Sequence, residues 1–301
     1  MNEAAAQTRD LSTMLRPRSV ALIGATDRSL WSRGTFDNLV SRKYAGEIHL
    51  VSRRGGTVHG RPAATSCVAV GEPIDLGLIM VPQAAMEEAL ADLAAAGARS
   101  AIMLTSGFAE TGADGRGLQE RLAGLVHQHG ISLLGPNCLG LVNFLDNVPL
   151  WTGGFRSPRT PGGIAVVAQS GATASFIAAL AQQQEIGLSH MISTGNEADL
   201  DAASFIDHLL DVPEVRAIAL FAETIRDAGR FMATARKAMA ARKPIVAARA
   251  AAIPEVAPHA VLFEPDSPKE LAAAIEEVRT TAPAPHEWLE QFDAPQVAEA
   301  F

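Results

Sequence analysis

The chain has 301 residues, of which 48% are hydrophobic, 19% charged and 5% aromatic. An apolar fraction of this size can build hydrophobic cores, so the composition excludes a disordered protein, and the length predicts two domains. The 25 Lys and Arg residues against 33 Asp and Glu residues give a net charge of −8. Because nucleic acid and anionic membranes bind positively charged surfaces, this charge argues against both as partners.

Cysteine usage and hydropathy predict where the chain resides. Two cysteines, Cys67 and Cys138, do not make a disulfide framework and indicate free thiols in a reducing compartment. Residues 1–18 contain no apolar signal core. No apolar run approaches the ~18 residues that a membrane span needs. We therefore expect a cytoplasmic protein with no membrane partner.

Short apolar runs alternate with helical patterns along the first half of the chain. A helix is predicted over 84–97, because Met86, Leu90, Leu93 and Gly97 recur at helical spacing. Strands and helices that alternate in this way form βαβ units with a parallel sheet. The predicted strands of this half cover 19–23, 47–51, 76–81, 101–104 and 131–134.

The alternation stops once and then resumes. Residues 143–163 are rich in Pro and Gly, which predicts an inter-domain connection at 146–163. The sequence thus predicts an α/β protein with two tandem doubly wound parallel-sheet domains, at 16–145 and 164–280, between tails at 1–15 and 281–301. In the second half, strands are expected at 164–168, 191–193, 215–221, 245–248 and 261–263, and helices at 172–184, 202–210, 228–241 and 268–279.

A glycine follows the first predicted strand. Gly24, with Ala25 and Thr26 after it, permits a tight turn, and the N–H groups at the start of the next helix then face an anion, usually a pyrophosphate. The G-x-G-x-x-G fingerprint is absent because position 26 is Thr, which argues against a plain NAD site. A turn glycine without any ligand is the alternative.

Two arginines follow the second predicted strand. Where an NAD site would carry an acidic residue for the ribose hydroxyl, this chain has Ser52, Arg53 and Arg54. Arginines favour a phosphorylated nucleotide, either a 2′-phosphate or the 3′-phosphate of coenzyme A. A solvated surface pair is the alternative.

Six stretches in one order resemble a known family. They are RPRSVALIGA at 16–25, LIMVP at 78–82, SGFAETG at 106–112, GPNCLG at 135–140, QSG at 169–171 and STGNEADLD at 193–201. Together they resemble the CoA-binding subunit of succinyl-CoA synthetase and the matching domains of NDP-forming acyl-CoA synthetases. The resemblance implies a Rossmann-like CoA-binding domain followed by a flavodoxin-like ligase domain. It also implies coenzyme A or acyl-CoA as ligand, an ATP-grasp partner subunit and assembly through subunit contacts, including a homo-oligomer.

The resemblance also implies which residues of the first domain bind CoA. It places one group at the phosphates, a second at the adenylate end, a third over the nucleotide and a fourth near the pantetheine thiol. Within the fourth group we interpret the cysteine as a small buried thiol and not as a nucleophile. The residues at the phosphates are Gly24, Ala25, Thr26, Gly34 and Thr35, and those at the adenylate end are Ser52 and Arg54. Those over the nucleotide are Val81 and Pro82, and those near the thiol are Glu110, Pro136, Asn137 and Cys138.

A second candidate site opens the second domain. Ser170 follows a strand and can cap a helix whose first N–H groups, at Gly171 and Ala172, can hold a phosphate. The resemblance implies that this site stabilises a phosphohistidine and an acyl phosphate, and that Glu223 orients the histidine. The alternatives are an ordinary N-cap and, for Glu223, a solvated strand-end carboxylate.

The sequence departs from the family after the predicted strand 245–248. The family carries its phosphohistidine there on a glycine-rich loop, but this chain has no Ser-His-Thr-Gly pattern. His259 is the only histidine of the gap and hence the candidate, and a polar strand-end residue is the alternative. We predict no metal site and interpret the acid-rich turn, Asn196, Glu197, Asp199 and Asp201, as loop-shaping.

Three functions remain open at this stage. The first is the CoA-binding component of an acid–thiol ligase that acts on an acyl-CoA thioester. The second is a relative without the phosphohistidine, either a CoA-dependent acyltransferase or a non-catalytic CoA- or acyl-CoA-binding protein. The third, a nicotinamide oxidoreductase, is disfavoured by the broken fingerprint and by Arg53 and Arg54. Whether the chain is an enzyme, and on which acyl group, stays open.

Overall fold

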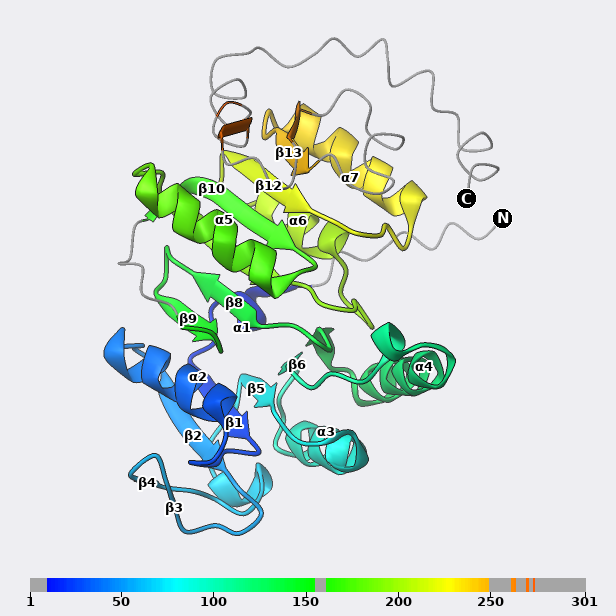
Figure 1. The fold of residues 1–301 in the computed structure, drawn as a ribbon. Coiled ribbons are helices and arrows are strands. Elements are labelled where there is room, and N and C mark those ends of the chain that lie inside the picture. The colour runs from blue at the N-terminus through cyan, green and yellow to red at the C-terminus, as the bar shows by residue number, and fades with distance from the viewer. Residues whose placement is uncertain (1–9, 155–160, 249–260, 264–268, 271–272, 274–301) are drawn as a thin grey trace.

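The two large sheets of the described residues are mainly parallel and lie one above the other (Figure 1). A computed structural model describes residues 10–154, 161–248, 261–263, 269–270 and 273. The first sheet is entirely parallel, in the order β2-β1-β5-β6-β7. Its strands are β1 (Ser19–Ile23), β2 (Glu47–Val51), β5 (Leu76–Ile79), β6 (Ser100–Met103) and β7 (Ser132–Leu134).

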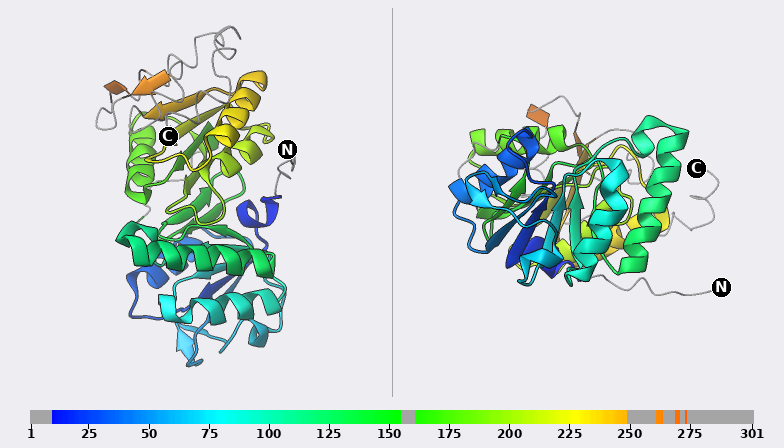
Figure 2. Two further views of the ribbon diagram at one scale, coloured as in Figure 1. Left: turned by 90° about the vertical axis from the view of Figure 1, so that its right-hand side faces the viewer. Right: turned by 90° about the horizontal axis from the view of Figure 1, so that it is seen from below.

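Helices cover both faces of this first sheet (Figure 2). Helix α2 (Leu30–Ser41) lies on one face, and helices α3 (Met86–Ala95) and α4 (Ala113–His129) lie on the other. Successive strand residues point to opposite faces, so Val20 packs into the core under α2 and Ala21 into the core under α3 and α4. Burial on both faces explains why β1 is apolar from Val20 to Ile23.

The second sheet joins a parallel part to an antiparallel hairpin. Its order is β14-β13-β12-β10-β11-β8-β9, and β8 and β9 are antiparallel to their neighbours. Helix α5 (Gly171–Gln183) packs on β10 and β11, and α6 (Ala202–Leu210) and α7 (Ala228–Ala240) pack on each other. The strands are β8 (Gly140–Asn143), β9 (Val148–Trp151), β10 (Pro161–Ala168), β11 (Leu188–Ser193), β12 (Ala217–Phe221), β13 (Ile245–Ala248) and β14 (Val261–Phe263).

The two doubly wound sheets confirm the predicted fold class, but the connection at 146–163 is not a plain linker. It contains β9 and the start of β10. β9 was not predicted because it contains Pro149, and a proline argues against a strand unless the strand lies at a sheet edge. β9 does lie at such an edge. The predicted N-terminal tail likewise includes helix α1 (Ser12–Leu15), whose Met14 is fully buried. The domain limits at 16–145 and 164–280 otherwise stay a prediction, and most of the helix expected at 268–279 lies outside the described residues.

The first domain packs directly on the edge of the second sheet. Asn38 of α2 donates its Nδ2–H to the carbonyl of Trp151 at 2.6 Å. A Cβ on Gly34 would lie 2.5 Å from the carbonyl oxygen of Thr152, so α2 approaches β9 as closely as a glycine allows. One core cluster accordingly contains residues of both sheets. Among the described helices, none has the length and apolar character needed to cross a membrane.

Candidate functional site

The first candidate site lies where three parallel strands of the first sheet end. Gly24 and Ala25 each donate a backbone N–H to the carbonyl of Val51 at 3.0 Å, which joins the ends of β1 and β2. Gly24 has φ +87°, and a Cβ there would lie 3.0 Å from Cγ1 of Val81, beyond the end of β5. The chain leaves β1 on opposite sides towards β2 and β5, and this switch point is where open α/β sheets bind ligands.

The loop from β1 to α2 uses its first N–H groups internally. Those of Gly24 and Ala25 go to Val51, and that of Thr26 goes to Oγ of Ser32 at 3.1 Å. Ser29 caps α2 by accepting from the N–H of Ser32. The first-turn N–H groups of a helix have no partner in its own ladder. An anion at this loop would therefore meet the start of α2 and not the N–H groups of Gly24, Ala25 and Thr26.

Two residues that the resemblance placed at the phosphates have other surroundings. Gly34 faces Thr152 of the second domain, as described above. Thr35 is fully buried, and its hydroxyl oxygen has no hydrogen-bond partner in the structure. In this structure the half-buried Gly34 and the buried Thr35 support the packing of α2.

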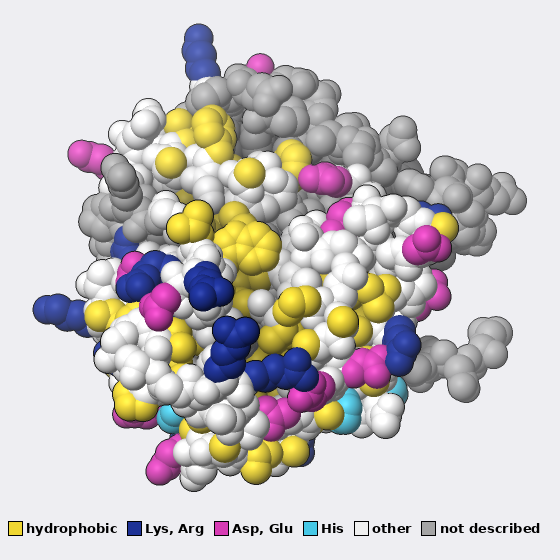
Figure 3. Space-filling model, turned by 60° about the horizontal axis from the view of Figure 1, so that its bottom comes forward, with side chains coloured by type: hydrophobic (Ala, Val, Ile, Leu, Met, Phe, Trp, Pro, Cys, Tyr) yellow, Lys and Arg dark blue, Asp and Glu magenta, His cyan; other side chains and the backbone are white. Residues whose placement is uncertain are grey.

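Basic side chains gather beside hydrophobic ones across the middle of one face of the molecule (Figure 3). After β2, Arg53 forms an ion pair with Glu88, whereas the exposed Arg54 has no ion pair or hydrogen bond with the described residues. Ser52 sits in a tight turn, donating to the carbonyl of Ala64 at 2.9 Å and accepting from Gly55 at 2.7 Å. Arg54 is thus the guanidinium of this pair that is free to meet a phosphate.

The ends of β5 and β6 lie side by side next to Gly24. Thr105 donates its hydroxyl to the carbonyl of Val81 at 2.7 Å, and Gln83 donates its amide to the carbonyl of Gly107 at 2.6 Å. Pro82 between them is exposed. Val81 and Pro82 therefore border the same sheet edge as Gly24.

Glu110 links the first domain to the second. Its carboxylate accepts the backbone N–H groups of Gly107 and Phe108 and also the side-chain amide of Asn196. Asn137, after β7, donates its amide to Oδ1 of Asn196 at 3.1 Å. The residues that the resemblance assigned to the thiol end of CoA thus meet at the boundary of the two domains.

Pro136 and Cys138 lie on the inner side of this boundary. The backbone N–H of Asn196 donates to the carbonyl of the buried Pro136 at 2.9 Å. The thiol of Cys138 is buried and lies 3.4 Å from the carbonyl of Met103. Burial raises the pKa of this thiol to about 12. A thiol that stays protonated is a poor nucleophile, which supports the interpretation of Cys138 as a buried packing residue.

The second candidate site opens helix α5. Ser170 caps the helix, and its Oγ accepts the N–H of Thr173 at 3.2 Å, which confirms the predicted cap. A Cβ on Gly171 would lie 2.4 Å from Cγ of Leu139, so the glycine lets α5 begin against the start of the second sheet. The N–H groups of Gly171 and Ala172 belong to the first turn and can face an anion.

Glu223 follows β12, the neighbour of β10, and is exposed. Its backbone N–H donates to Oε1 of Gln169 at 2.6 Å. The strand order on the parallel side of the second sheet places a switch point between β10 and β12. The Ser170 turn and Glu223 therefore lie at one edge of the second sheet.

The acid-rich turn shapes a loop, as the sequence predicted. Asp199 accepts the N–H of Leu133 at 2.9 Å, and Asp201 caps α6 by accepting from Ser204 at 2.8 Å. Glu197, only 2% exposed, accepts from the hydroxyl of Thr194 at 2.8 Å. Burial, only partly offset by that hydrogen bond, raises the pKa of Glu197 to about 7. A shallow pocket beside this turn is lined by Glu197, Asp201, Ala202, Ala203, Ala222, Thr224, Ile225, Arg226, Asp227 and Phe231.

Sequence reasoning left several polar residues at these edges without a role. Gln169 was noted only as part of a motif, although its side chain fixes the Glu223 turn. Ser32 and His59 were not singled out, although they meet beside the β1–α2 loop. No local signal marks such contacts, because the partners are far apart in sequence. The predicted phosphohistidine candidate, His259, lies outside the described residues.

The comparisons with known proteins agree with this geometry. Residues 18–143 match a family described as a CoA binding domain, and residues 161–264 match a succinyl-CoA ligase like flavodoxin domain. The chain is 33% identical over 241 residues to the α subunit of acetate–CoA ligase (ADP-forming) II of Pyrococcus furiosus, covering 80% of this chain and 52% of that protein. It is 32% identical over 250 residues to a trans-feruloyl-CoA synthase from an unknown prokaryotic organism, covering 82% and 35%.

Solved structures show the same likeness. A protein of Pyrococcus horikoshii OT3 is 30% identical with a TM-score of 0.73, covering 89% of this chain and 57% of that one. The dinucleotide forming acetyl-coenzyme A synthetase 1 of Ca. Korarchaeum cryptofilum, in its apo form, is 26% identical with a TM-score of 0.74, covering 89% and 58%.

Fold, sheet edges and comparisons define a class: α/β proteins with a CoA-binding domain followed by a flavodoxin-like ligase domain. The chain belongs to the family of the CoA-binding α subunits of NDP-forming acyl-CoA synthetases. This membership confirms the resemblance seen in the sequence and sets the nicotinamide alternative aside. The chain spans about half the length of the curated α subunit, 52%.

Proposed function

We propose that the chain is the CoA-binding component of an NDP-forming acyl-CoA synthetase, working with an ATP-grasp partner. The observation that carries the proposal is the junction of the two sheet edges. Asn196, just after β11, bonds both Pro136 of the first domain and the carboxylate of Glu110. A CoA held on the first edge would therefore have its thiol end at the border of the edge that carries Ser170 and Glu223.

The residues would divide the reaction between them. The start of α2, where the loop after Gly24 ends, would receive the diphosphate of CoA, and Arg54 would receive the 3′-phosphate. The start of α5 would hold the phosphoryl group while Glu223 orients the histidine that carries it. Transfer of this phosphoryl group to a carboxylate gives an acyl phosphate. Attack by the CoA thiolate then forms the thioester and releases inorganic phosphate.

Calorimetric titration of the purified chain with CoA tests the proposal, with NAD and NADP as controls. We expect saturable binding of CoA alone. Arg54→Ala should lower the affinity for CoA several-fold and leave the affinity for dephospho-CoA unchanged, since only the partner of the 3′-phosphate is lost. Arg53→Ala is the matched control, because Arg53 is already paired with Glu88. Absence of CoA binding by the wild type would refute the proposal.

A second candidate is a family member without the phosphohistidine step, either an acyltransferase or a non-catalytic CoA-binding protein. The observation that favours it is in the sequence, since residues 249–260 contain no glycine and one histidine, His259. Incubation with acetyl-CoA and ³²P-labelled phosphate separates the two candidates, because the ligase steps run in reverse would label the protein on histidine. Label that disappears in His259→Ala supports the ligase, and CoA binding without label supports the second candidate.

A further inference from the structure

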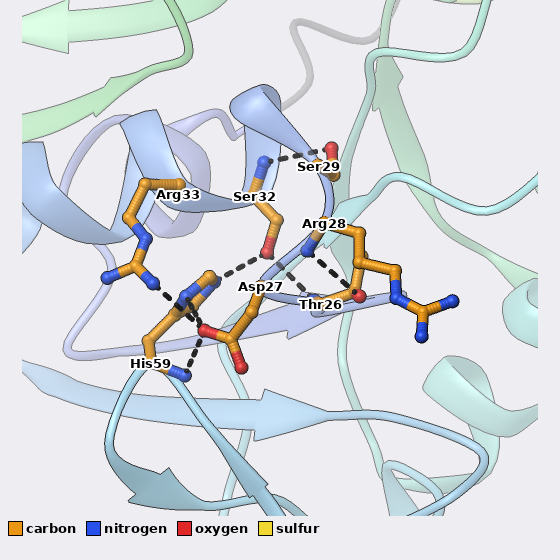
Figure 4. A network of polar contacts seen from close by, with 7 residues as sticks. All are labelled: Thr26, Asp27, Arg28, Ser29, Ser32, Arg33 and His59. Carbon is orange, nitrogen blue, oxygen red and sulfur yellow. Dashed lines mark hydrogen bonds and ion pairs between the residues drawn. The ribbon is translucent and has the colours of Figure 1, made fainter.

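A buried histidine connects three elements around the β1–α2 loop (Figure 4). His59 sits in the turn between β3 (Thr57–Val58) and β4 (Arg61–Pro62), and its side chain has no exposed surface. Its Nε2 lies 2.7 Å from Oγ of Ser32 in the first turn of α2. Its Nδ1 lies 3.1 Å from Oδ1 of Asp27 in the loop. We name these three residues the His59 relay.

The hydrogen bonds of the His59 relay have one consistent direction. Asp27 accepts the backbone N–H of His59 at 3.0 Å, which lowers the pKa of its carboxyl below the usual value. An ionised Asp27 only accepts, so in the singly protonated form of the ring Nδ1 of His59 donates to Asp27 and Nε2 accepts. Ser32 then donates its hydroxyl to Nε2 while its oxygen accepts the N–H of Thr26 at 3.1 Å. Each N–H and O–H group named here then has an acceptor.

The arrangement has the residue types of a serine nucleophile with its base, but not the access that such a nucleophile needs. Ser32 is fully buried, and its oxygen is already occupied by Thr26. Packing also fixes the imidazole, since the ring of Phe36 stacks on it with centroids 5.0 Å apart. The guanidinium of Arg61 lies 5.1 Å from the centroid of that phenyl ring. The relay can instead fix the conformation of the loop at Thr26.

We propose that the His59 relay is a positioning device for CoA, in which Ser32 and His59 fix the β1–α2 loop in the shape that receives the ligand. The inference rests on the proposed function, because it assumes that the ligand of this loop is CoA. Neither side chain touches the ligand. The relay acts on the loop through the hydrogen bond from the Thr26 N–H to Ser32. The contact of Ser32 with Nε2 therefore positions the loop, and the contact of Asp27 with Nδ1 anchors the imidazole ring.

Substitutions that preserve one half of the relay at a time test this proposal. A glutamine side chain can place its amide near Nε2, and an asparagine side chain can place its amide near Nδ1. We expect His59→Asn and Ser32→Ala to weaken CoA binding about tenfold in calorimetric titration. His59→Gln should rescue most of that affinity, within about threefold of wild type. His127→Asn, on the exposed end of α4, is the matched control and should bind as wild type does.

Two further readouts separate positioning from general stability. Thermal midpoints should fall by similar amounts in His59→Asn and His59→Gln, although their affinities for CoA differ. Amide hydrogen exchange of the peptide that contains Thr26 should quicken in Ser32→Ala and His59→Asn and stay slow in His59→Gln. CoA affinity equal to wild type in Ser32→Ala and His59→Asn would overturn the role of the relay alone. No CoA binding by the wild type would overturn this inference together with the proposed function.

Discussion

The side-chain amide of Gln169 pairs with the backbone at Glu223 as one strand pairs with another. Its Oε1 accepts the N–H groups of Glu223 at 2.6 Å and of Thr224 at 2.9 Å, and its Nε2 donates to the carbonyl of Thr224 at 2.8 Å. Gln169 directly follows β10 and is 8% exposed. One buried side chain therefore fixes the backbone from which the exposed Glu223 side chain extends.

Gln169→Met should destabilise the protein by about 2 kcal/mol, because it keeps the length of the side chain and leaves partly buried backbone groups without partners. Urea unfolding of the two proteins measures the difference. Gln183→Met, at the exposed end of α5, is the control and should change the free energy of unfolding little. Equal losses in both variants would show that the pairing with the Glu223 turn contributes nothing specific.

Gly195 should tolerate no side chain, because its turn lies against the first domain. It has φ +61°, and a Cβ there would lie 2.2 Å from the carbonyl oxygen of Pro136. Left-handed backbone and steric overlap together predict that Gly195→Ala lowers the free energy of unfolding by about 2 kcal/mol or more. Gly124→Ala is the matched control, since nothing lies within 4 Å of its added Cβ in α4.

The control should move in the opposite direction. Alanine in an exposed helix interior is favoured over glycine by about 0.5–1 kcal/mol, so Gly124→Ala should raise the midpoint of urea unfolding. A Gly195→Ala protein as stable as wild type would mean that the junction at Pro136 can open without cost. The coupling of the two sheet edges would then be weaker than the contacts of Asn196 suggest.

The strands were predictable where burial on both faces makes them continuous apolar runs. β1 is such a strand, buried along its whole length, and has the bounds that the sequence predicted. The edge strand β2, which is partly exposed, and helix α6 also have their predicted bounds. β9 was missed because Pro149 and the glycines around it outweigh its buried residues Val148 and Leu150 in a local pattern. Local propensity describes a strand poorly when its place at a sheet edge permits the proline.

The candidate site was predictable as a set of strand ends but not as a set of contacts. Gly24 and Ser170 follow strands, so their place at the carboxyl edges comes from the parallel topology alone. Gly34 is a residue type typical of phosphate loops, but here it lets α2 pack against Thr152. The contacts of Ser32 with His59 depend on how the β3–β4 turn folds back. No spacing in the sequence indicates such a contact.

Both cysteines should resist thiol reagents in the folded protein. Burial raises the pKa of Cys138 to about 12 and also raises that of Cys67, so the reactive thiolate is scarce at both positions. At pH 8 a chromogenic disulfide reagent should label the native chain slowly and the urea-unfolded chain rapidly, with two thiols per chain. Rapid labelling of one native thiol would contradict the burial and reopen a nucleophilic role for Cys138.

Glu197 should make the protein less stable as the pH rises towards and through neutrality. Burial raises the pKa of this carboxyl from 4.5 to about 7 in the folded state. Between these values the folded chain holds a proton that the unfolded chain has lost. The stabilisation is therefore fully present below pH 4.5 and disappears as the pH passes 7, a change on the order of 3 kcal/mol.

Glu197→Gln isolates this contribution, since the amide oxygen can still accept from Thr194 and from the N–H of Ala202. The variant should match wild type near pH 4.5 and become the more stable protein by pH 8. Free energies of unfolding from urea titrations across this range measure the divergence. Parallel curves for the two proteins would show that Glu197 is ionised in the folded state throughout the range. The acid-rich turn would then hold a buried charge, stabilised by the donors Thr194, Ala202 and Gln169.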